Sequence, residues 1–197
     1  MSDQPTSILP GGGGFGSQEP SPTRPNRRPL AWNPGTDTGL LLLRVAVGGT
    51  FFAHGMQIVT GMWGGPGVAE FARTLEGFGY QQAPVLAWVA GLTALVGGAL
   101  VVLGFLTPIA AAGLLALMIN SVAVKVGNGF FIASPAGANA VELDVVLGLS
   151  AAALVLTGPG RLALDNGRTW HRRPASWGVL ALVIGVAAGV LVLVLLR

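Results

Sequence analysis

The sequence predicts an all-α membrane protein whose helices cross the bilayer five times. Of its 197 residues, 52% are hydrophobic and 10% are charged, whereas about 25% of the residues in an ordinary soluble domain are charged. So few polar residues cannot cover a soluble fold, and lipid is therefore expected to surround the helices. The 31 glycines fit this class, because small residues let membrane helices approach one another closely.

Residues 1–38 are predicted to form a disordered cytoplasmic tail. They are rich in proline, glycine and serine and lack apolar periodicity. The tail carries Arg24, Arg27 and Arg28 just before the first apolar stretch. The positive-inside rule accounts for these arginines without a nucleic-acid partner.

Five apolar stretches follow the tail, at residues 39–60, 84–106, 108–126, 141–157 and 177–196. The first is not a cleaved signal peptide, because it is long, carries Arg44 near its start and lacks a small-residue cleavage site. The short link at Leu106-Thr107-Pro108 predicts that the second and third helices form an antiparallel pair. The fourth stretch is short for a bilayer that needs roughly 20 residues, so four helices plus a re-entrant segment remain an alternative.

The charges of the loops predict the orientation. Basic residues concentrate in the tail and in a predicted cytoplasmic linker at residues 167–176, with Arg161 just before it, whereas the opposite side holds Arg73 and Lys125. The N-terminus is therefore expected in the cytoplasm, and the C-terminus, after an additional helix at 177–197, outside.

The chain has no cysteine, which excludes disulfides, cysteine-ligated iron–sulfur clusters and a thiol nucleophile. Its two histidines are His54 and His171, and the second lies in the arginine-rich loop, so no haem held by two buried histidines is expected. No metal site, no covalently bound cofactor and no nucleophile–base pair is predicted. The chain is not expected to be an enzyme on its own.

Ionisable residues within apolar stretches are the main functional signal, because an isolated charge in a membrane is costly. They are Arg44, His54, Lys125, Glu142 and Asp144, and Gln57 lies one turn after His54. The predicted topology places Arg44 near the cytoplasmic side. It places His54, Lys125 and one or both acids in a polar cluster near the outer face.

Each of these residues has a structural alternative. Arg44 can extend to the lipid headgroups, His54 can be a packed histidine, and Lys125 can form an ion pair with Glu142 or Asp144. In a functional interpretation, histidine and a carboxylate form a proton relay or hydrogen-bond the oxygens of a quinone. Gly185-x-x-x-Gly189 matches a close-packing pattern, although chance matches are expected in a glycine-rich chain.

The order of several short motifs resembles the DoxX family. The first helix contains Leu41-Leu42-Leu43-Arg44 and Phe52-Ala53-His54-Gly55, and later segments include Gly104-Phe105-Leu106-Thr107 and Asn128-Gly129-Phe130-Phe131. The closing run Gly158-Pro159-Gly160-Arg161-Leu162-Ala163-Leu164-Asp165 resembles the family's last motif. The resemblance covers about residues 39–166.

The resemblance implies a four-helix transmembrane bundle, here with a fifth C-terminal transmembrane helix, in a bacterial inner membrane. It also implies an association with redox machinery, namely quinol oxidase, thiosulfate–quinone oxidoreductase or actinobacterial oxidative-stress complexes with superoxide dismutase and a sulfurtransferase. Arg44, His54 and Glu142 match positions that the family favours. Where the family commonly has a glutamate in the second helix, this chain has Thr93-Ala94-Leu95.

The expected function is therefore that of an accessory or anchoring subunit of a quinone-linked or antioxidant redox complex. Its candidate quinone or proton site comprises Arg44, His54, Gln57, Lys125, Glu142 and Asp144, and its partners are the lipid bilayer and proteins of the complex. The alternatives are a transporter of small solutes or protons and a purely structural membrane scaffold.

Overall fold

The computed structural model describes residues 34–131, 133, 137, 140–165 and 174–197. The described part is helical, and no strand occurs within it. The long helices are α1 (Pro34–Thr60), α3 (Ala83–Leu103), α4 (Thr107–Lys125), α5 (Glu142–Thr157) and α7 (Pro174–Leu195). They are joined by the shorter helices η1 (Met62–Gly64), α2 (Gly67–Gly77) and η2 (Val126–Asn128). The all-α prediction is confirmed.

The predicted stretches agree with the five long helices to within a few residues at most ends. Two differences stand out at the predicted domain borders. Helix α1 begins at Pro34, so the last residues of the predicted tail are helical, and the rest of the tail lies outside the described residues. Helix α7 begins at Pro174, inside the predicted linker, whose basic residues Arg168, Arg172 and Arg173 also lie outside the described part.

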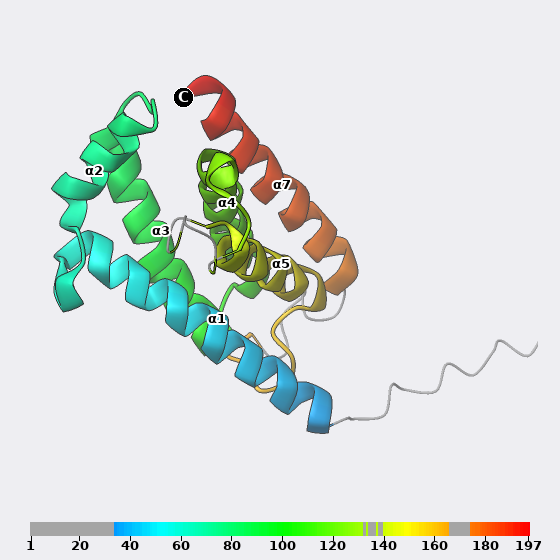
Figure 1. Cartoon of the computed structure of the whole chain (residues 1–197). Helices are drawn as coiled ribbons and strands as arrows, with labels where there is room; N and C mark the ends of the chain where they lie inside the picture. The colour runs from blue at the N-terminus through cyan, green and yellow to red at the C-terminus, as the bar shows by residue number, and fades with distance from the viewer. Residues whose placement is uncertain (1–33, 132, 134–136, 138–139, 166–173) are drawn as a thin grey trace, which may run out of the picture. The chain divides into compact units, whose positions relative to one another are not determined.

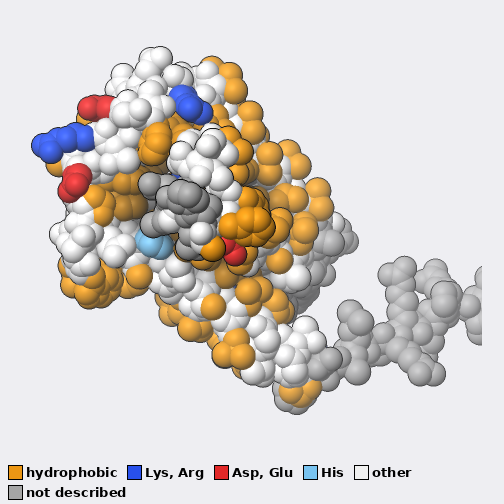
Figure 2. All heavy atoms as spheres, viewed as in Figure 1, with side chains coloured by type: hydrophobic (Ala, Val, Ile, Leu, Met, Phe, Trp, Pro, Cys, Tyr) orange, Lys and Arg blue, Asp and Glu red, His pale blue; other side chains and the backbone are white. Residues whose placement is uncertain are grey.

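Helix α2 was missed by the sequence analysis, which left residues 61–83 as a loop. Apart from Gly67 at its start, its half-buried and buried residues are Val68, Phe71, Ala72 and Leu75, a helical spacing that gives the short element one apolar face. The other face carries Glu70 and other exposed polar residues. Figure 2 shows charged side chains gathered mainly over α2, on a surface that is otherwise largely hydrophobic.

The two ends of the helical unit follow from the helix directions. Contacts between Gly48 and Gly98 and between Gly55 and Leu95 make α1 and α3 antiparallel. The first end, as we use the term, holds the starts of α1, α4 and α7 and the ends of α3 and α5. The second end holds α2, the starts of α3 and α5 and the ends of α1, α4 and α7.

Glycines allow α1 and α3 to pack with their backbones in contact. A Cβ atom at Gly55 would lie 2.3 Å from the backbone nitrogen of Leu95, and one at Gly98 would lie 2.5 Å from that of Phe52. Larger residues at these positions would force the helices apart, as the small-residue rule for membrane helices states. The core beside this contact includes Phe51 and Leu114.

The turn between α3 and α4 is as tight as predicted. Gly104 has a φ of 67° and ends α3, and the N–H of Phe105 donates to the carbonyl of Leu100 at 2.9 Å, which satisfies a terminal carbonyl in the manner of a Schellman cap. Pro108 lies in the first turn of α4, where a missing N–H costs nothing.

Helix α7 runs parallel to α4 and lies on the far side of α4 and α5 from α1 (Figure 1). The Gly185-x-x-x-Gly189 pattern is a real contact, since a Cβ at Gly185 would lie 2.7 Å from the carbonyl oxygen of Ala112. Asn120 of α4 donates to the carbonyl of Gly189 at 3.1 Å and accepts from the Tyr80 hydroxyl at 2.9 Å. Burial raises the pKa of Tyr80, and the charge of Arg197 acts against that shift.

Four helical segments among the described residues are long and apolar enough to cross a membrane: Pro34–Thr60, Ala83–Leu103, Thr107–Asn128 and Ser176–Leu195. The chain is therefore a multi-pass membrane protein. Helix α5 has 16 residues, about 24 Å at 1.5 Å per residue, which bears out its predicted shortness. It nevertheless runs from the second end to the first, since Asp144 at its start contacts Lys125 and Val155 near its end contacts Gly178.

Candidate functional site

Arg44 lies at the first end and is almost completely buried, with 1% of its surface exposed. Its Nη2 donates to the carbonyl oxygen of Leu162. Its Nε and Nη1 have no hydrogen-bond partner within the described part of the chain. The side chain therefore lies inside the protein rather than extending to lipid headgroups, and the described residues leave two of its three nitrogens without a hydrogen bond.

The segment 158–165, which we name the strap, covers Arg44 and crosses the first ends of three helices. The N–H of Arg161 donates to Asp37 Oδ1 in α1 at 2.9 Å. The N–H of Asp165 donates to the carbonyl of Gly104 at 3.0 Å. Asp165 Oδ2 in turn accepts from the N–H of Thr107 at 3.3 Å, so this buried carboxylate caps the start of α4. The strap fixes the start of α1 and the turn between α3 and α4.

The sequence analysis missed Asp165 as a site residue and used it only as the end of a motif. The side chains of Arg44, Thr107 and Asp165 are all buried at the first end. Gly104 lies between them, since a Cβ there would be 2.0 Å from Arg44 Nη1. The sequence holds no local signal for this cap, because a capping aspartate ordinarily adjoins the helix start, whereas Asp165 lies 58 residues after it.

His54 and Gln57 lie on one face of α1, in the half nearer the second end. His54 Nδ1 is 3.2 Å from Gln57 Oε1, a distance suited to a hydrogen bond in the tautomer that carries the proton on Nδ1. His54 is exposed and Gln57 is half-buried. His54 therefore bonds to a neighbouring amide, as a structural role would require, but its side chain is exposed on a membrane-spanning helix.

Lys125 and Asp144 form an ion pair at the second end, with 2.9 Å between Nζ and Oδ2. The side chains are 25% and 12% exposed, respectively. This pairing confirms one of the two ion pairs that the sequence analysis considered. Glu142 lies two residues before Asp144 and is half-buried, and its backbone N–H donates to the carbonyl of Phe130 at 3.0 Å.

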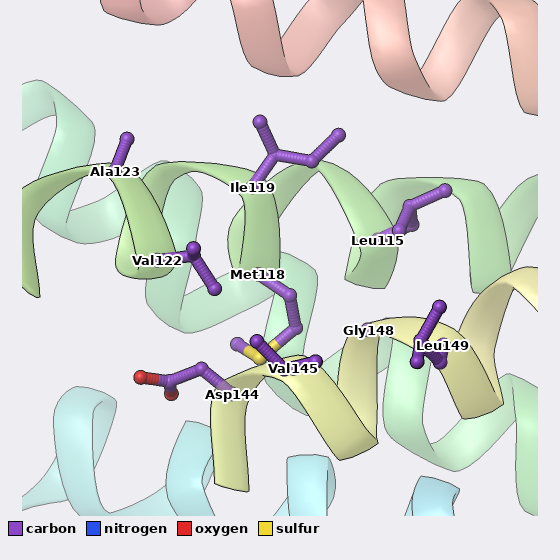
Figure 3. Close-up of a pocket in the computed structure, with 9 residues that line it drawn as sticks. All are labelled: Leu115, Met118, Ile119, Val122, Ala123, Asp144, Val145, Gly148 and Leu149. Atoms are coloured by element: carbon purple, nitrogen blue, oxygen red, sulfur yellow. The ribbon is translucent and has the colours of Figure 1, made fainter. Parts of the chain in front are cut away.

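A groove of about 320 Å³ runs between α4 and α5 and ends at this ion pair. Figure 3 shows the aliphatic side chains of both helices along it, with the carboxylate of Asp144 at one end. Its lining residues are Leu115, Met118, Ile119, Val122, Ala123, Asp144, Val145, Gly148 and Leu149. The groove has an apolar length and one charged end.

The structure separates the six predicted site residues into three places. Arg44 lies at the first end, whereas Lys125, Asp144 and Glu142 lie at the second, about 27 Å away along α4. His54 and Gln57 bond to each other on α1. Of the predicted polar cluster of His54, Lys125 and one or both acids, the structure brings Lys125 and Asp144 together, whereas His54 bonds to Gln57 on α1. Arg44 belongs to a separate buried cluster. Within the described residues, no group of three or more His, Cys, Asp or Glu side chains could hold a metal ion.

The sequence of the chain is similar to one protein family and to a protein of known name. A family model described as DoxX matches residues 39–126. Over 134 residues the chain is 36% identical to a Bacillus subtilis (strain 168) protein named "Putative oxidoreductase CatD", and the match covers 68% of this chain and 89% of that protein. No solved structure matches the chain at a significant level.

Proposed function

We propose that this chain, which belongs to the DoxX family, is an accessory membrane subunit of a quinone-linked redox complex. The name of its Bacillus subtilis relative, which includes the word oxidoreductase, supports a redox-linked role. The proposed location is the inner membrane of a bacterium, with the N-terminus in the cytoplasm and the C-terminus outside.

The His54–Gln57 pair carries this proposal. Both side chains lie on α1, which is long and apolar enough to cross a membrane. A polar pair on such a helix is costly unless it has a partner or a function. His54 is exposed, so a quinone that diffuses in the bilayer can reach it. With its Nδ1–H bonded to Gln57 Oε1, His54 has an Nε2 that accepts a hydrogen bond from a hydroxyl of the reduced head group, and the amide N–H of Gln57 is a suitable donor to a carbonyl oxygen of the oxidised one.

The depth of His54 fits such a ligand. His54 lies six residues before the end of α1 at Thr60, or about 9 Å along the helix axis. The head group of a quinone is the polar end of an otherwise apolar molecule, and this depth lies just below the membrane interface. A quinone bound here would therefore keep its apolar tail in the hydrocarbon core.

The chain's own chemistry in this proposal is binding and orientation. It has no cysteine and therefore no thiol that could carry electrons. An imidazole ring can both donate and accept a proton, so His54 is the group suited to passing a proton to or from the bound head group. The electrons come from a partner protein of the complex, which the chain holds at the membrane.

Co-purification tests the proposal. The full chain is purified in mild detergent from cells that make a prenyl quinone, and bound quinone is measured by liquid chromatography and mass spectrometry. We expect quinone in the wild type and a loss of about tenfold or more in the double variant His54→Leu with Gln57→Leu, because both hydrogen-bonding side chains are gone. Thr50→Val is the matched control, since Thr50 lies one turn earlier and bonds only to the carbonyl of Ala46.

A purely structural role is the second candidate, and the Lys125–Asp144 ion pair favours it, because it joins the ends of α4 and α5. The same experiment separates the two. Wild-type protein that carries no quinone and no redox partner after purification in mild detergent supports the structural role. Equal quinone in the wild type and the double variant excludes His54 and Gln57 as its site.

A further inference from the structure

We propose that the groove between α4 and α5 binds one acyl chain of a zwitterionic phospholipid, whose headgroup lies against the Lys125–Asp144 ion pair. This lipid site is distinct from the His54–Gln57 pair, and it holds whether or not the quinone-linked role does. Its occupant is drawn from the bilayer itself.

The lining of the groove fits a hydrocarbon chain. Of its nine lining residues, Asp144 alone carries a charge, and the others are aliphatic residues, methionine or glycine. The floor is formed where α4 and α5 approach closely at Gly148, since a Cβ there would lie 3.2 Å from the Cβ of Met118. An acyl chain in such a groove makes van der Waals contacts with the lining side chains, and these contacts are lost when the groove is empty.

The length and position of the groove fit one leaflet. Along α4 the lining extends from Leu115 to Ala123, which is about 12 Å at 1.5 Å per residue. It ends two residues from Lys125 at the second end. Half of a hydrocarbon core of about 30 Å is about 15 Å, so the groove follows the path of an acyl chain from the membrane interface towards the midplane.

The charged end selects the headgroup. Lys125 and Asp144 lie 2.9 Å apart and both keep some exposed surface. A zwitterionic headgroup presents a phosphate and an ammonium group, which complement the lysine and the aspartate, respectively. An anionic headgroup complements only the lysine. A neutral quinone ring offers no charge to either, so it would gain little from displacing water at an existing ion pair.

Native mass spectrometry tests the site. The delipidated full chain in detergent is titrated with phosphatidylethanolamine, phosphatidylglycerol and menaquinone in parallel. We expect phosphatidylethanolamine to bind about tenfold more tightly than phosphatidylglycerol, equivalent to about 1.4 kcal/mol. The variant Ala123→Phe, which fills the groove, is expected to lose this binding by about tenfold or more. The double variant Lys125→Met with Asp144→Asn is expected to bind both phospholipids alike.

The control is Val146→Phe, because Val146 is an exposed α5 residue next to the groove but not part of its lining. If Ala123→Phe does not fold, Leu149→Trp replaces it, since Leu149 is 68% exposed at the outer edge of the groove. Equal or tighter binding of phosphatidylglycerol to the wild type, displacement of phosphatidylethanolamine by menaquinone, or binding unchanged in the groove-filling variant would each overturn the proposal.

Discussion

The burial of Arg44 does not follow from a gain in the stability of the fold. A buried guanidinium needs several hydrogen bonds to offset its lost hydration, and among the described residues Arg44 has only its bond to the carbonyl of Leu162. Removing a buried, poorly compensated charge is often neutral or stabilising when an apolar side chain fills the space. The aliphatic part of the Arg44 side chain therefore contributes to packing, whereas its buried charge lowers the stability of the fold.

A buried, poorly compensated charge at Arg44 predicts different outcomes for two substitutions. Arg44→Ala is expected to lower the stability by about 2–5 kcal/mol, because it leaves a cavity. Arg44→Met fills most of the same space without a charge, and we expect it to lose less than half as much. Thermal unfolding of both variants in the same detergent measures the difference. Equal losses would mean that the charge itself stabilises the fold.

The position of Arg44 in the first half of the first helix follows from the sequence, but its surroundings do not. Its depth follows from counting residues along a helix, which is local information. Its partner Leu162 lies 118 residues later, in a segment without apolar periodicity, and no local rule connects the two. The same holds for Asp165 and Thr107. His54 and Gln57 were paired correctly from the sequence, because three residues along a helix place two side chains on one face.

At the level of elements, α7 is joined to α4 by glycine contacts and by one side chain, Asn120. The backbone of α7 also meets the second end directly, since the N–H of Gln81 donates to the carbonyl of Leu196 at 2.6 Å. Helix α7 lies outside the region that the family model matches. It is nevertheless part of the same core, to which Ala181 contributes.

Helices α7 and α4 approach each other closely at Gly185, so a larger residue at this position is expected to push them apart. Gly185→Leu is expected to lower the unfolding free energy by about 1–3 kcal/mol, as overpacking does, because a Cβ already lies 2.7 Å from the carbonyl of Ala112. Ala187→Leu is the control, since Ala187 is exposed on the same helix. Thermal unfolding in detergent compares the two, and equal stability would show that α7 does not depend on this contact.

The long helices were predicted from the sequence, whereas the short helix α2 and the glycine contact of α7 were not. Five long helices follow from apolar runs, which need no knowledge of tertiary contacts. Helix α2 was missed because it has 11 residues, although its apolar residues at Val68, Phe71, Ala72 and Leu75 follow the i, i+3, i+4, i+7 pattern of an amphipathic helix. The glycine pair in α7 could not be separated from chance in the sequence, because a contact depends on which helix faces it.

At the level of the whole molecule, the alternation of helix directions places the two ends on opposite sides of a bilayer. Exposed tryptophans support this arrangement, since Trp63 lies at the second end and Trp177 at the first, where aromatic side chains favour the membrane interfaces. The strap and the start of α1 are at the first end, and α2 and the end of α7 are at the second. Which side faces the cytoplasm rests on the loop charges.

The absence of cysteine from the sequence allows a direct test of orientation. Glu76→Cys places a thiol on the exposed face of α2, and Leu164→Cys places one on the exposed part of the strap. We expect a membrane-impermeant maleimide to label Glu76→Cys in intact cells and Leu164→Cys only after permeabilisation. The wild type reports background labelling. The reverse pattern would place the N-terminus outside and contradict the loop-charge argument.

The strap has a consequence for how the protein is made. Arg44 enters the membrane with α1, but its acceptor on Leu162 lies 118 residues later in the chain. At a synthesis rate of roughly 5–20 residues per second, the ribosome needs roughly 6–24 s to deliver it. During that interval, a bare guanidinium has to be accommodated by water, lipid phosphate or the insertion machinery. The first end can therefore close only as one of the last steps of biogenesis, after α5 has been inserted.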